Sequence, residues 1–441
     1  MRGCGLRRTA RNRVPANTMG AMKTRYLGCA VYEHTLEVPW DPQNPELGTF
    51  ELFARELVPP GGEHYPAFLY LQGGPGFPAP RPISISGVIK EALKTHRVVL
   101  LDQRGTGRSH RIDCDTLGTD ADKLHLLRQE FIVHDAEALR KALGISAWTL
   151  YGQSFGGFCI TSYLSLYPES VAESYITGGL PALEAHVDDV YRATYAAIAR
   201  RSEEFYSQFP WAEARIREIC HHLDNSNEKL PTGERLSSRR FRTIGIDLGR
   251  SAGFYSLAYL LESPFQRNGE KKLKTDVLAE IGAKVSFASA PLYAAIHESI
   301  YGGIGGPQTA WSAHRLRGEI EGFAQDADLR SNEKFYLTGE HIYPWHFEED
   351  PALVPFAQAA QDLAMRRWDA SPYRPEALAQ SPIAAACVYV DDAFVPYEYS
   401  LHTADKLCDA RLHITNQYQH DGIHWAGEEI LALLKSKVAD H

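Results

Sequence analysis

The stretch "LYGQSFGGFCI", residues 150–160, decides the fold. It continues a short apolar run that begins at Trp148, passes through the pentad G-Q-S-F-G and enters a second apolar run. Glycines on either side of Ser154 permit a sharp turn, and a helix after the turn would direct its positive end at the serine. A G-x-S-x-G pentad between a strand and a helix is typical of a nucleophile elbow, so Ser154 is the predicted nucleophile. The alternative is a glycine-rich turn in which the serine is incidental.

Other apolar runs in the chain also end in turn residues, which is typical of strands buried on both faces. The predicted strands are residues 67–71, 97–101, 148–151, 386–390 and 411–415. The predicted helices are residues 134–143, 158–167 and 426–438; a glycine follows the first and a proline follows the second. Alternating strands and helices predict an α/β fold with a mostly parallel central sheet and helices on both faces.

The alternation stops between residues 181 and 380, where helix formers, aromatic residues and charged residues predominate. We predict a large helical cap there, inserted before the strand that carries an acidic pair. Residues 31–180 and 381–441 then form the catalytic domain. Residues 1–30 are predicted to be a disordered N-terminal extension. Because residues 1–25 carry seven basic side chains and no acid, a mitochondrial targeting segment is the alternative.

Composition narrows the class of protein. The chain has 441 residues, of which 44% are hydrophobic and 23% charged, as in ordinary globular proteins. A net charge of −9 and the lack of a basic stripe argue against a nucleic-acid partner. No apolar run is long enough for a transmembrane helix, so no membrane association is expected. The seven cysteines contain no C-x-x-C pair, which favours reduced thiols and a cytoplasmic location.

A serine needs a base before it can attack, and the base needs an orienting acid. In α/β-hydrolases these residues follow the serine in the order acid, then histidine. The predicted strand 386–390 leads into two aspartates, and Asp392 is the predicted acid because "DAFVP" matches a turn common after that strand in these enzymes. Asp391 remains the alternative. His420 suits the loop before the last helix best, and His424 remains the alternative.

Acyl transfer also needs backbone N–H groups that bind the oxyanion. The N–H group of Phe155, directly after the nucleophile, is one predicted donor. The second is expected from a loop after an earlier strand. The run "LQGGPGF", residues 71–77, supplies this loop, and Gly74 is the predicted donor.

Together these motifs resemble the proline iminopeptidase family of α/β-hydrolases, over most of residues 35–438. Smaller members of the family carry HGGPG, whereas Gln72 replaces that histidine here, as in the larger members. The larger form also fits the long predicted insert. The motifs that carry the resemblance are "LQGGPGF" (71–77), "LLDQRGTGRS" (100–109), "GQSFGG" (152–157), "VDDAFVP" (390–396) and "QHDG" (419–422).

The resemblance implies a serine exopeptidase that releases an N-terminal residue, preferably proline, from short peptides with a free N-terminus. A charged α-amine entering a pocket needs carboxylates, and in this family acidic residues of the cap supply them. The segments "HESIYGG" and "GEHIYPWHFE" nominate Glu298 and Glu340, with solvated surface acids as the alternative. Asp102 and Arg104 are expected to brace the loop beside the site.

The implied mechanism uses an acyl-enzyme and requires no metal or organic cofactor. Two other functions remain open at this stage. An esterase or amidase acting on small acyl substrates would share the triad without binding an amine. A non-catalytic binding protein could retain the hydrolase fold. The oligomeric state has no signature in the sequence.

Overall fold

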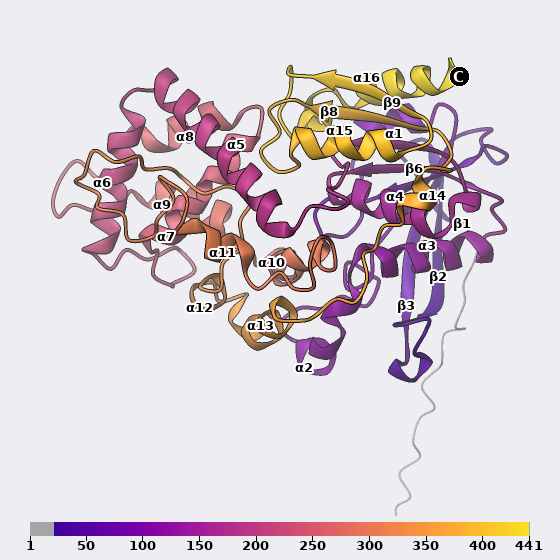
Figure 1. Ribbon diagram of the computed structural model, residues 1–441, viewed down its shortest axis with the longest axis horizontal. Coiled ribbons are helices and arrows are strands. Elements are labelled where there is room, and N and C mark those ends of the chain that lie inside the picture. The colour runs from indigo at the N-terminus through magenta and orange to yellow at the C-terminus, as the bar shows by residue number, and fades with distance from the viewer. Residues whose placement is uncertain (1–21, 441) are drawn as a thin grey trace, which may run out of the picture.

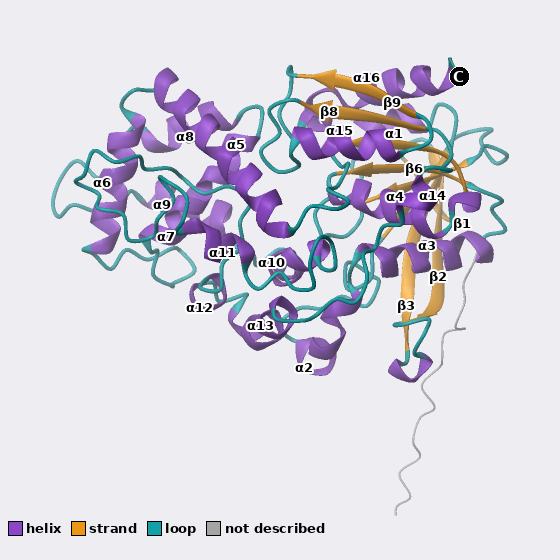
Figure 2. Cartoon of the chain, viewed as in Figure 1, coloured by secondary structure: helices purple, strands orange, loops and turns teal. Residues whose placement is uncertain are grey.

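The computed structural model describes residues 22–440. Within this range nine strands form one sheet in the order β1-β2-β3-β5-β4-β6-β7-β8-β9 (Figures 1 and 2). The strands are β1 (Met22–Tyr26), β2 (Cys29–Pro39), β3 (Thr49–Val58), β4 (Ala67–Leu71), β5 (Arg97–Leu101), β6 (Trp148–Gln153), β7 (Val171–Thr177), β8 (Ala384–Tyr389) and β9 (Ala410–Thr415).

The sheet is antiparallel at one side and parallel over the rest. β1, β2, β3 and β5 pair antiparallel in that order, and every pair from β5 to β9 is parallel. Parallel strands end at the same edge, so the loops after β4, β6 and β8 meet there. The five predicted strands are all present, and the predicted fold class of a mostly parallel sheet with helices on both faces is confirmed.

Alternate residues of the central strands enter two separate cores, as the period of two in a strand requires. Leu69 and Leu71 of β4 pack with α3 and α4, whereas Phe68 and Tyr70 pack with α1 and α16. The sheet is therefore covered on both faces. The helices that flank it are α1 (Gly87–Ala92), α3 (Gln129–Ala142), α4 (Phe155–Leu166), α15 (Tyr397–Lys406) and α16 (Gly422–Ala439); the short α2 (Leu117–Asp120) follows the loop after β5.

A long helical segment joins β7 to β8. Its first helices gather at the end of the molecule away from α3 and α16 (Figure 1). Its buried residues share one continuous core with α3 and α4, so the segment is packed onto the sheet layer. The helices of this segment are α5 (Val187–Gln208), α6 (Ala212–Asp224), α7 (Ser238–Phe241), α8 (Gly253–Leu261), α9 (Thr275–Val285), α10 (Pro291–Ile296), α11 (Ser312–Arg317), α12 (His346–Glu349), α13 (Ala357–Ala364) and α14 (Pro375–Leu378).

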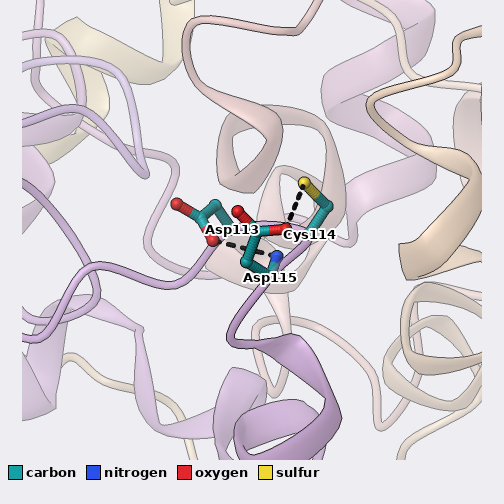
Figure 3. Close-up of side chains that lie close together, drawn as sticks. All are labelled: Asp113, Cys114 and Asp115. Atoms are coloured by element: carbon teal, nitrogen blue, oxygen red, sulfur yellow. Dashed lines mark hydrogen bonds between the residues drawn. The ribbon is translucent and has the colours of Figure 1, made fainter.

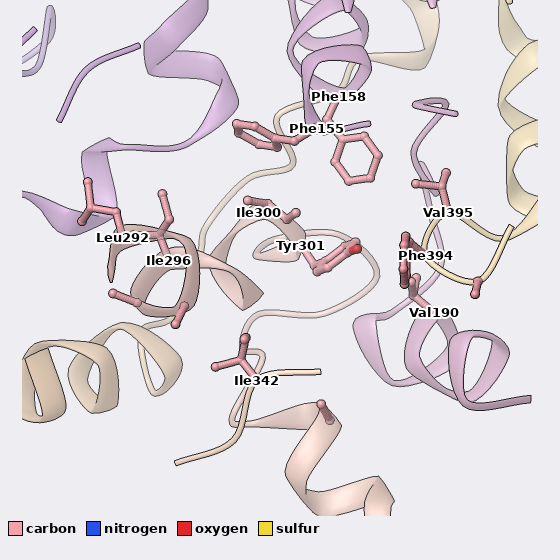
Figure 4. Close-up of a cluster of buried hydrophobic side chains, with 14 of the residues drawn as sticks. Phe155, Phe158, Val190, Leu292, Ile296, Ile300, Tyr301, Ile342, Phe394 and Val395 are labelled. Atoms are coloured by element: carbon pink, nitrogen blue, oxygen red, sulfur yellow. The ribbon is translucent and has the colours of Figure 1, made fainter. Parts of the chain in front are cut away.

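The junction between this segment and the sheet layer is apolar (Figure 4). Phe155 and Phe158 of α4 lie opposite Ile300 and Tyr301, which belong to the short 3-10 helix Glu298–Tyr301 (η5). The rings of Phe158 and Tyr301 meet edge to face, with centroids 6.0 Å apart. The helix that follows Ser154 is thus packed directly against the helical segment, in addition to the covalent connection through β7.

Two predictions about the chain are wrong. Residues 22–30, placed in a disordered extension, form β1 and the start of β2, because a tight turn at Leu27 and Gly28 lets them pair with each other. Both turn residues have positive φ, as a two-residue hairpin turn needs. Residues 1–21 of that extension lie outside the described residues. β9 is also not buried on both faces, because it is the edge strand.

The helices described between residues 22 and 440 include none that is both long enough and apolar enough to cross a membrane. The division into a catalytic domain and a cap stays a prediction.

Candidate active site

Ser154 lies at a sharp turn between β6 and α4. Its φ of 54° and ψ of −125° are unusual for a residue with a side chain, and such strain is typical of functional sites. The turn is held by two hydrogen bonds: the Ser154 N–H donates to the carbonyl of Thr177 (3.0 Å), and the Gly157 N–H donates to the carbonyl of Ser154 (2.8 Å).

The glycines of the pentad are required by close packing. A Cβ atom on Gly156 would lie 2.1 Å from the carbonyl oxygen of Leu71, and one on Gly152 would lie 2.3 Å from the backbone of Gly156. Such distances are far inside van der Waals contact, so no side chain fits at either position. The strand–turn–helix geometry therefore depends on the glycines that identified it in the sequence.

His420 and Asp392 come together beside the elbow, although 28 residues separate them. Nδ1 of His420 lies 2.8 Å and 3.0 Å from the two carboxylate oxygens of Asp392. The Asp392 carboxylate also accepts hydrogen bonds from the N–H groups of Phe394 (2.9 Å) and Val395 (3.0 Å), which fix its orientation in the turn after β8. This arrangement leaves Nε2 of His420 as the nitrogen that can take a proton.

The surroundings of His420 change its basicity. Burial lowers the pKa of the imidazole, but the charge of Asp392 and its hydrogen bond raise it more, with smaller contributions from Glu340 and Asp421. The net result is a pKa above the ordinary value of histidine. The protonated imidazole that forms when a serine is deprotonated is therefore stabilised.

The alternative residues are not part of this pair, although His424 lines the same cavity as Ser154. His424 is exposed near the start of α16, and Asp391 is only partly buried. The structure joins His420 to Asp392 and does not bring His424 to either aspartate.

Ser154 and His420 line one cavity of about 790 Å³, within the usual size of ligand pockets. Gly74 and Gln72 lie in its wall, on the loop after β4. Gly74 has a φ of 82°, a conformation that glycine adopts without strain. Phe155 is the first residue of α4, directly after Ser154 in the chain. One predicted oxyanion donor, Gly74, is therefore on a loop that lines the cavity with Ser154, and the other, Phe155, is at the start of α4 beside the serine.

The helical segment closes the other side of this cavity. Glu340 lies in the cavity wall and accepts a short hydrogen bond from the hydroxyl of Tyr293, which lines the cavity too. The ring of Tyr293 contacts Phe77 of the loop after β4, with centroids 5.5 Å apart. Sequence reasoning missed Tyr293, because a tyrosine in an apolar helical run carries no signal that separates it from a core residue.

Glu298, in the same helical segment, is buried, with 5% of its surface exposed, and does not line the cavity. One carboxylate oxygen accepts a hydrogen bond from the Ala313 N–H (3.1 Å), and the other has no hydrogen-bond partner. Burial raises the pKa of Glu298 to about 7. Burial and the charges of Glu340, Glu298 and Asp392 also raise the pKa of Tyr301, so all three carboxylates lie near enough to act on its hydroxyl.

Asp102 and Arg104 are both fully engaged away from the cavity. Asp102 accepts hydrogen bonds from the Arg81 guanidinium (2.8 Å) and from the N–H groups of Ala79 (3.0 Å) and Arg108 (2.8 Å). Arg104 donates to Asp135 and to the carbonyl of Trp40. Both residues thus brace the loops around the site.

Asp113, Cys114 and Asp115 form a small acidic cluster on the loop after β5 (Figure 3). Their ligand atoms lie close enough together to hold a metal ion. Asp113 already accepts hydrogen bonds from Arg111 (3.1 Å) and from the N–H of Asp115 (3.0 Å), and the cluster is largely exposed. We therefore assign it no metal and no part in the chemistry.

Comparison with known proteins places this chemistry in a family. Residues 66–284 match the family model of the alpha/beta hydrolase fold. A proline iminopeptidase of Aspergillus aculeatus is 29% identical over 92% of this chain and 93% of its own. A solved structure of proline iminopeptidase from Mycobacterium smegmatis covers 92% of this chain and 98% of its own at 15% identity, with a TM-score of 0.44.

A proline iminopeptidase of Aeromonas sobria is 41% identical over 408 residues, which are 90% of this chain and 94% of the relative. Identity of this extent includes both the sheet layer and the helical segment. The chain belongs to the proline iminopeptidase family of α/β-hydrolases.

Proposed function

We propose that this protein is a serine exopeptidase that releases an N-terminal residue, preferably proline, from short peptides with a free N-terminus. One observation carries the proposal. The cavity that contains Ser154 and His420 is also lined by Glu340, a carboxylate from the helical segment. A nucleophile, its base and an acceptor for a positively charged amine thus line the one cavity that a substrate would enter.

In the proposed reaction, Nε2 of His420 takes the proton from the Ser154 hydroxyl while the serine oxygen attacks the carbonyl carbon of the first residue. Asp392 holds the imidazole in the correct tautomer and stabilises its charge. His420 then gives the proton to the departing amine as the peptide bond breaks. Water, deprotonated by the same histidine, hydrolyses the acyl-enzyme and frees the amino acid. These steps need no metal or organic cofactor.

The oxyanion that forms on the carbonyl is assigned to the N–H groups of Gly74 and Phe155. Phe155 begins α4, so the helix dipole adds to its N–H group. Gly74 stands in the cavity wall, where a glycine leaves room for a carbonyl to approach the backbone. Donors fixed before the reaction are worth several kcal/mol, roughly 3, to the transition state.

The substrate amine is assigned to the two glutamates. Glu340 reaches the cavity directly, and Tyr293 fixes its carboxylate. Glu298 has a buried oxygen without a partner, which an ammonium group could satisfy. Burial raises the pKa of Glu298 to about 7, so its protonation is finely balanced near neutral pH. A positively charged amine nearby stabilises the carboxylate and so favours its ionised form. A substrate without a positive amine would leave these carboxylates uncompensated, which accounts for exopeptidase specificity.

The competing function is an esterase or amidase on small acyl substrates. Glu340→Gln separates the two, because only the peptidase needs a charge opposite the amine. We expect kcat/KM for a free prolyl-arylamide to fall about 30-fold or more, and kcat/KM for an aryl ester that lacks an amine to change little. Glu321→Gln, at a largely exposed position of the same segment, is the matched control. A kcat/KM for prolyl-arylamide that Glu340→Gln leaves unchanged would favour the esterase, whereas an equal loss on both substrates would show that Glu340 supports the fold and does not bind the amine.

The proposal also includes the division of the chain into domains and the cellular compartment of the protein. We assign residues 31–180 and 381–441, together with the paired strand residues 22–30, to the catalytic domain and residues 181–380 to a cap that binds the amine. The six cysteines between residues 22 and 440 have free thiols, including the exposed Cys114 and Cys408. Exposed thiols are compatible with a reducing compartment, and we propose the cytoplasm. No nucleic acid or membrane enters the scheme.

A further inference from the structure

A second groove, of about 490 Å³, continues the active-site cavity. The two share Tyr70, Pro80, Ile423 and His424 in their walls. The groove runs between the first turn of α1 and the first turns of α16, two helices that pack against each other on the same face of the sheet. A ligand could therefore extend from the cavity into the groove without leaving the protein surface.

The groove has a mixed lining, with polar residues such as Ser86 and Glu429 beside apolar side chains, and an exposed aromatic rim. Val88 and Ile89 of α1 contribute buried side chains to it, and Tyr70 forms part of its floor. Trp425 stands at the rim with 60% of its surface exposed, and its indole N–H donates to the Asp421 carboxylate (3.1 Å), which limits the ring's orientation. A large apolar side chain held in water beside a groove is typical of a binding surface.

The direction of the groove follows from the chemistry of His420. The departing amine must receive its proton from this histidine, so the residues after the scissile bond begin beside it. The backbone that continues from His420 reaches Ile423 and His424, which both cavity and groove share. Glu340 lies in the part of the cavity formed by the helical segment. A peptide whose amine contacts Glu340 and whose scissile bond lies at Ser154 thus has the groove ahead of it.

We propose that the groove between α1 and α16 binds the part of a peptide that leaves, and that it favours substrates of three or more residues with an apolar side chain at the third position. This inference rests on the proposed exopeptidase function. Trp425 is the specificity-determining residue at the rim. The third residue is the one assigned to it because the second residue lies beside His420, where its amine accepts the proton.

The test compares kcat/KM for four substrates: prolyl-arylamide, Pro-Gly, Pro-Gly-Gly-Gly and Pro-Gly-Leu-Gly. We expect the wild type to prefer the leucine peptide over its glycine counterpart by about tenfold, the effect of one apolar contact in a pocket. Trp425→Ala should abolish this preference, whereas Trp425→Phe, which keeps a ring but loses the bond to Asp421, should retain most of it. Tyr259→Ala, at a 71% exposed aromatic residue of α8, is the control and should keep the preference.

The outcomes are distinguishable. Failure of the wild type to cleave prolyl-arylamide would overturn the exopeptidase function itself, and the groove's role with it. Cleavage of prolyl-arylamide without any preference for the leucine peptide would overturn the groove alone. Equal loss of the preference in Trp425→Ala and Trp425→Phe would also overturn it, because the effect would then pass through Asp421 and the His420 loop.

Discussion

At the scale of single residues, the reactivity of Ser154 depends on the protonation state of His420. The imidazole must be neutral to take the serine proton, and Asp392 shifts its pKa above the ordinary value near 6.5. Activity should therefore be lost as the pH falls through a pKa higher than that of a free histidine. The profile of kcat, rather than of kcat/KM, isolates this group, because kcat reports the enzyme–substrate complex.

Asp392→Asn tests this origin of the pKa. Burial alone lowers the pKa of His420, so removing the carboxylate should move the acid limb of the kcat profile to lower pH. The maximal kcat should fall by about 10⁴-fold, because the asparagine favours the wrong tautomer. The measurement is kcat for prolyl-arylamide between pH 5 and pH 9 in both proteins. An acid limb that stays in place would show that another group limits the reaction.

At the scale of elements, the site is produced by the contact between the start of α4 and the end of β4. The carbonyl of Leu71 lies where a side chain on Gly156 would be, so the helix and strand approach as closely as their backbones allow. This contact aligns the loop that carries Gly74 with the elbow that carries Ser154. Because α4 and β4 approach this closely, the loop after β4 and the turn after β6 line one cavity.

Gly156→Ala should separate these two elements. Its Cβ would overlap the Leu71 carbonyl at 2.1 Å, so the backbone must move. We expect kcat to fall about 100-fold, since a displacement near 1 Å has such an effect on a reacting geometry. Overpacking should also lower stability by about 1–3 kcal/mol. Gly118→Ala, in α2 with open space around it, is the control and should lower neither kcat nor the melting temperature. An active and stable Gly156→Ala would contradict the packing argument.

At the scale of the whole molecule, the helical segment holds the His420 loop as well as forming the cavity wall. Ser251 donates its N–H (2.8 Å) and its hydroxyl (2.7 Å) to Asp421, the residue after the histidine. The Ser251 hydroxyl also accepts from the Gln419 N–H (3.2 Å), and the His420 N–H donates to the Gly249 carbonyl (3.3 Å). The base is therefore positioned by both parts of the chain.

Ser251→Ala should loosen this connection without touching the triad. Losing the hydroxyl removes two hydrogen bonds, each worth about 1 kcal/mol, so kcat should fall at least about fivefold. Ser331→Ala removes a hydroxyl that bonds a carbonyl in an exposed turn of the same segment and should leave kcat unchanged. The comparison is made with prolyl-arylamide at saturating concentration. A kcat equal to that of the wild type would mean that the loop is held by other contacts.

The sequence predicted five of the six strands that pair in parallel, because each of the five is a short apolar run that ends in turn residues. It did not predict β7, whose sequence VAESYIT has polar residues in its middle. It did not predict β2 and β3, whose mixed burial places polar and apolar residues in less regular alternation. The edge position of β9 depends on the strand order, which no single run encodes. Among site residues, Asp392 and His420 follow strands and could be nominated from position alone.

Tyr293 and Ser251 could not be predicted in this way. Their roles depend on how the helical segment packs over the cavity, and nothing in the local sequence marks a tyrosine in an apolar helix or a serine in a turn as a contact of the site. Glu298 could be nominated from its motif, but its burial required the structure. The sequence therefore supports the catalytic residues more strongly than the residues that select the substrate.

The most direct test of the account is the hydrolysis of prolyl-arylamide with a free amine and with a blocked amine, by the wild type and by Ser154→Ala. The account predicts rapid cleavage of the free substrate by the wild type, a loss on the order of 10⁶-fold in Ser154→Ala, and little cleavage of the blocked substrate by either protein. Equal cleavage of the free and blocked substrates by the wild type would contradict it, because the carboxylates of the helical segment would then have no amine to bind.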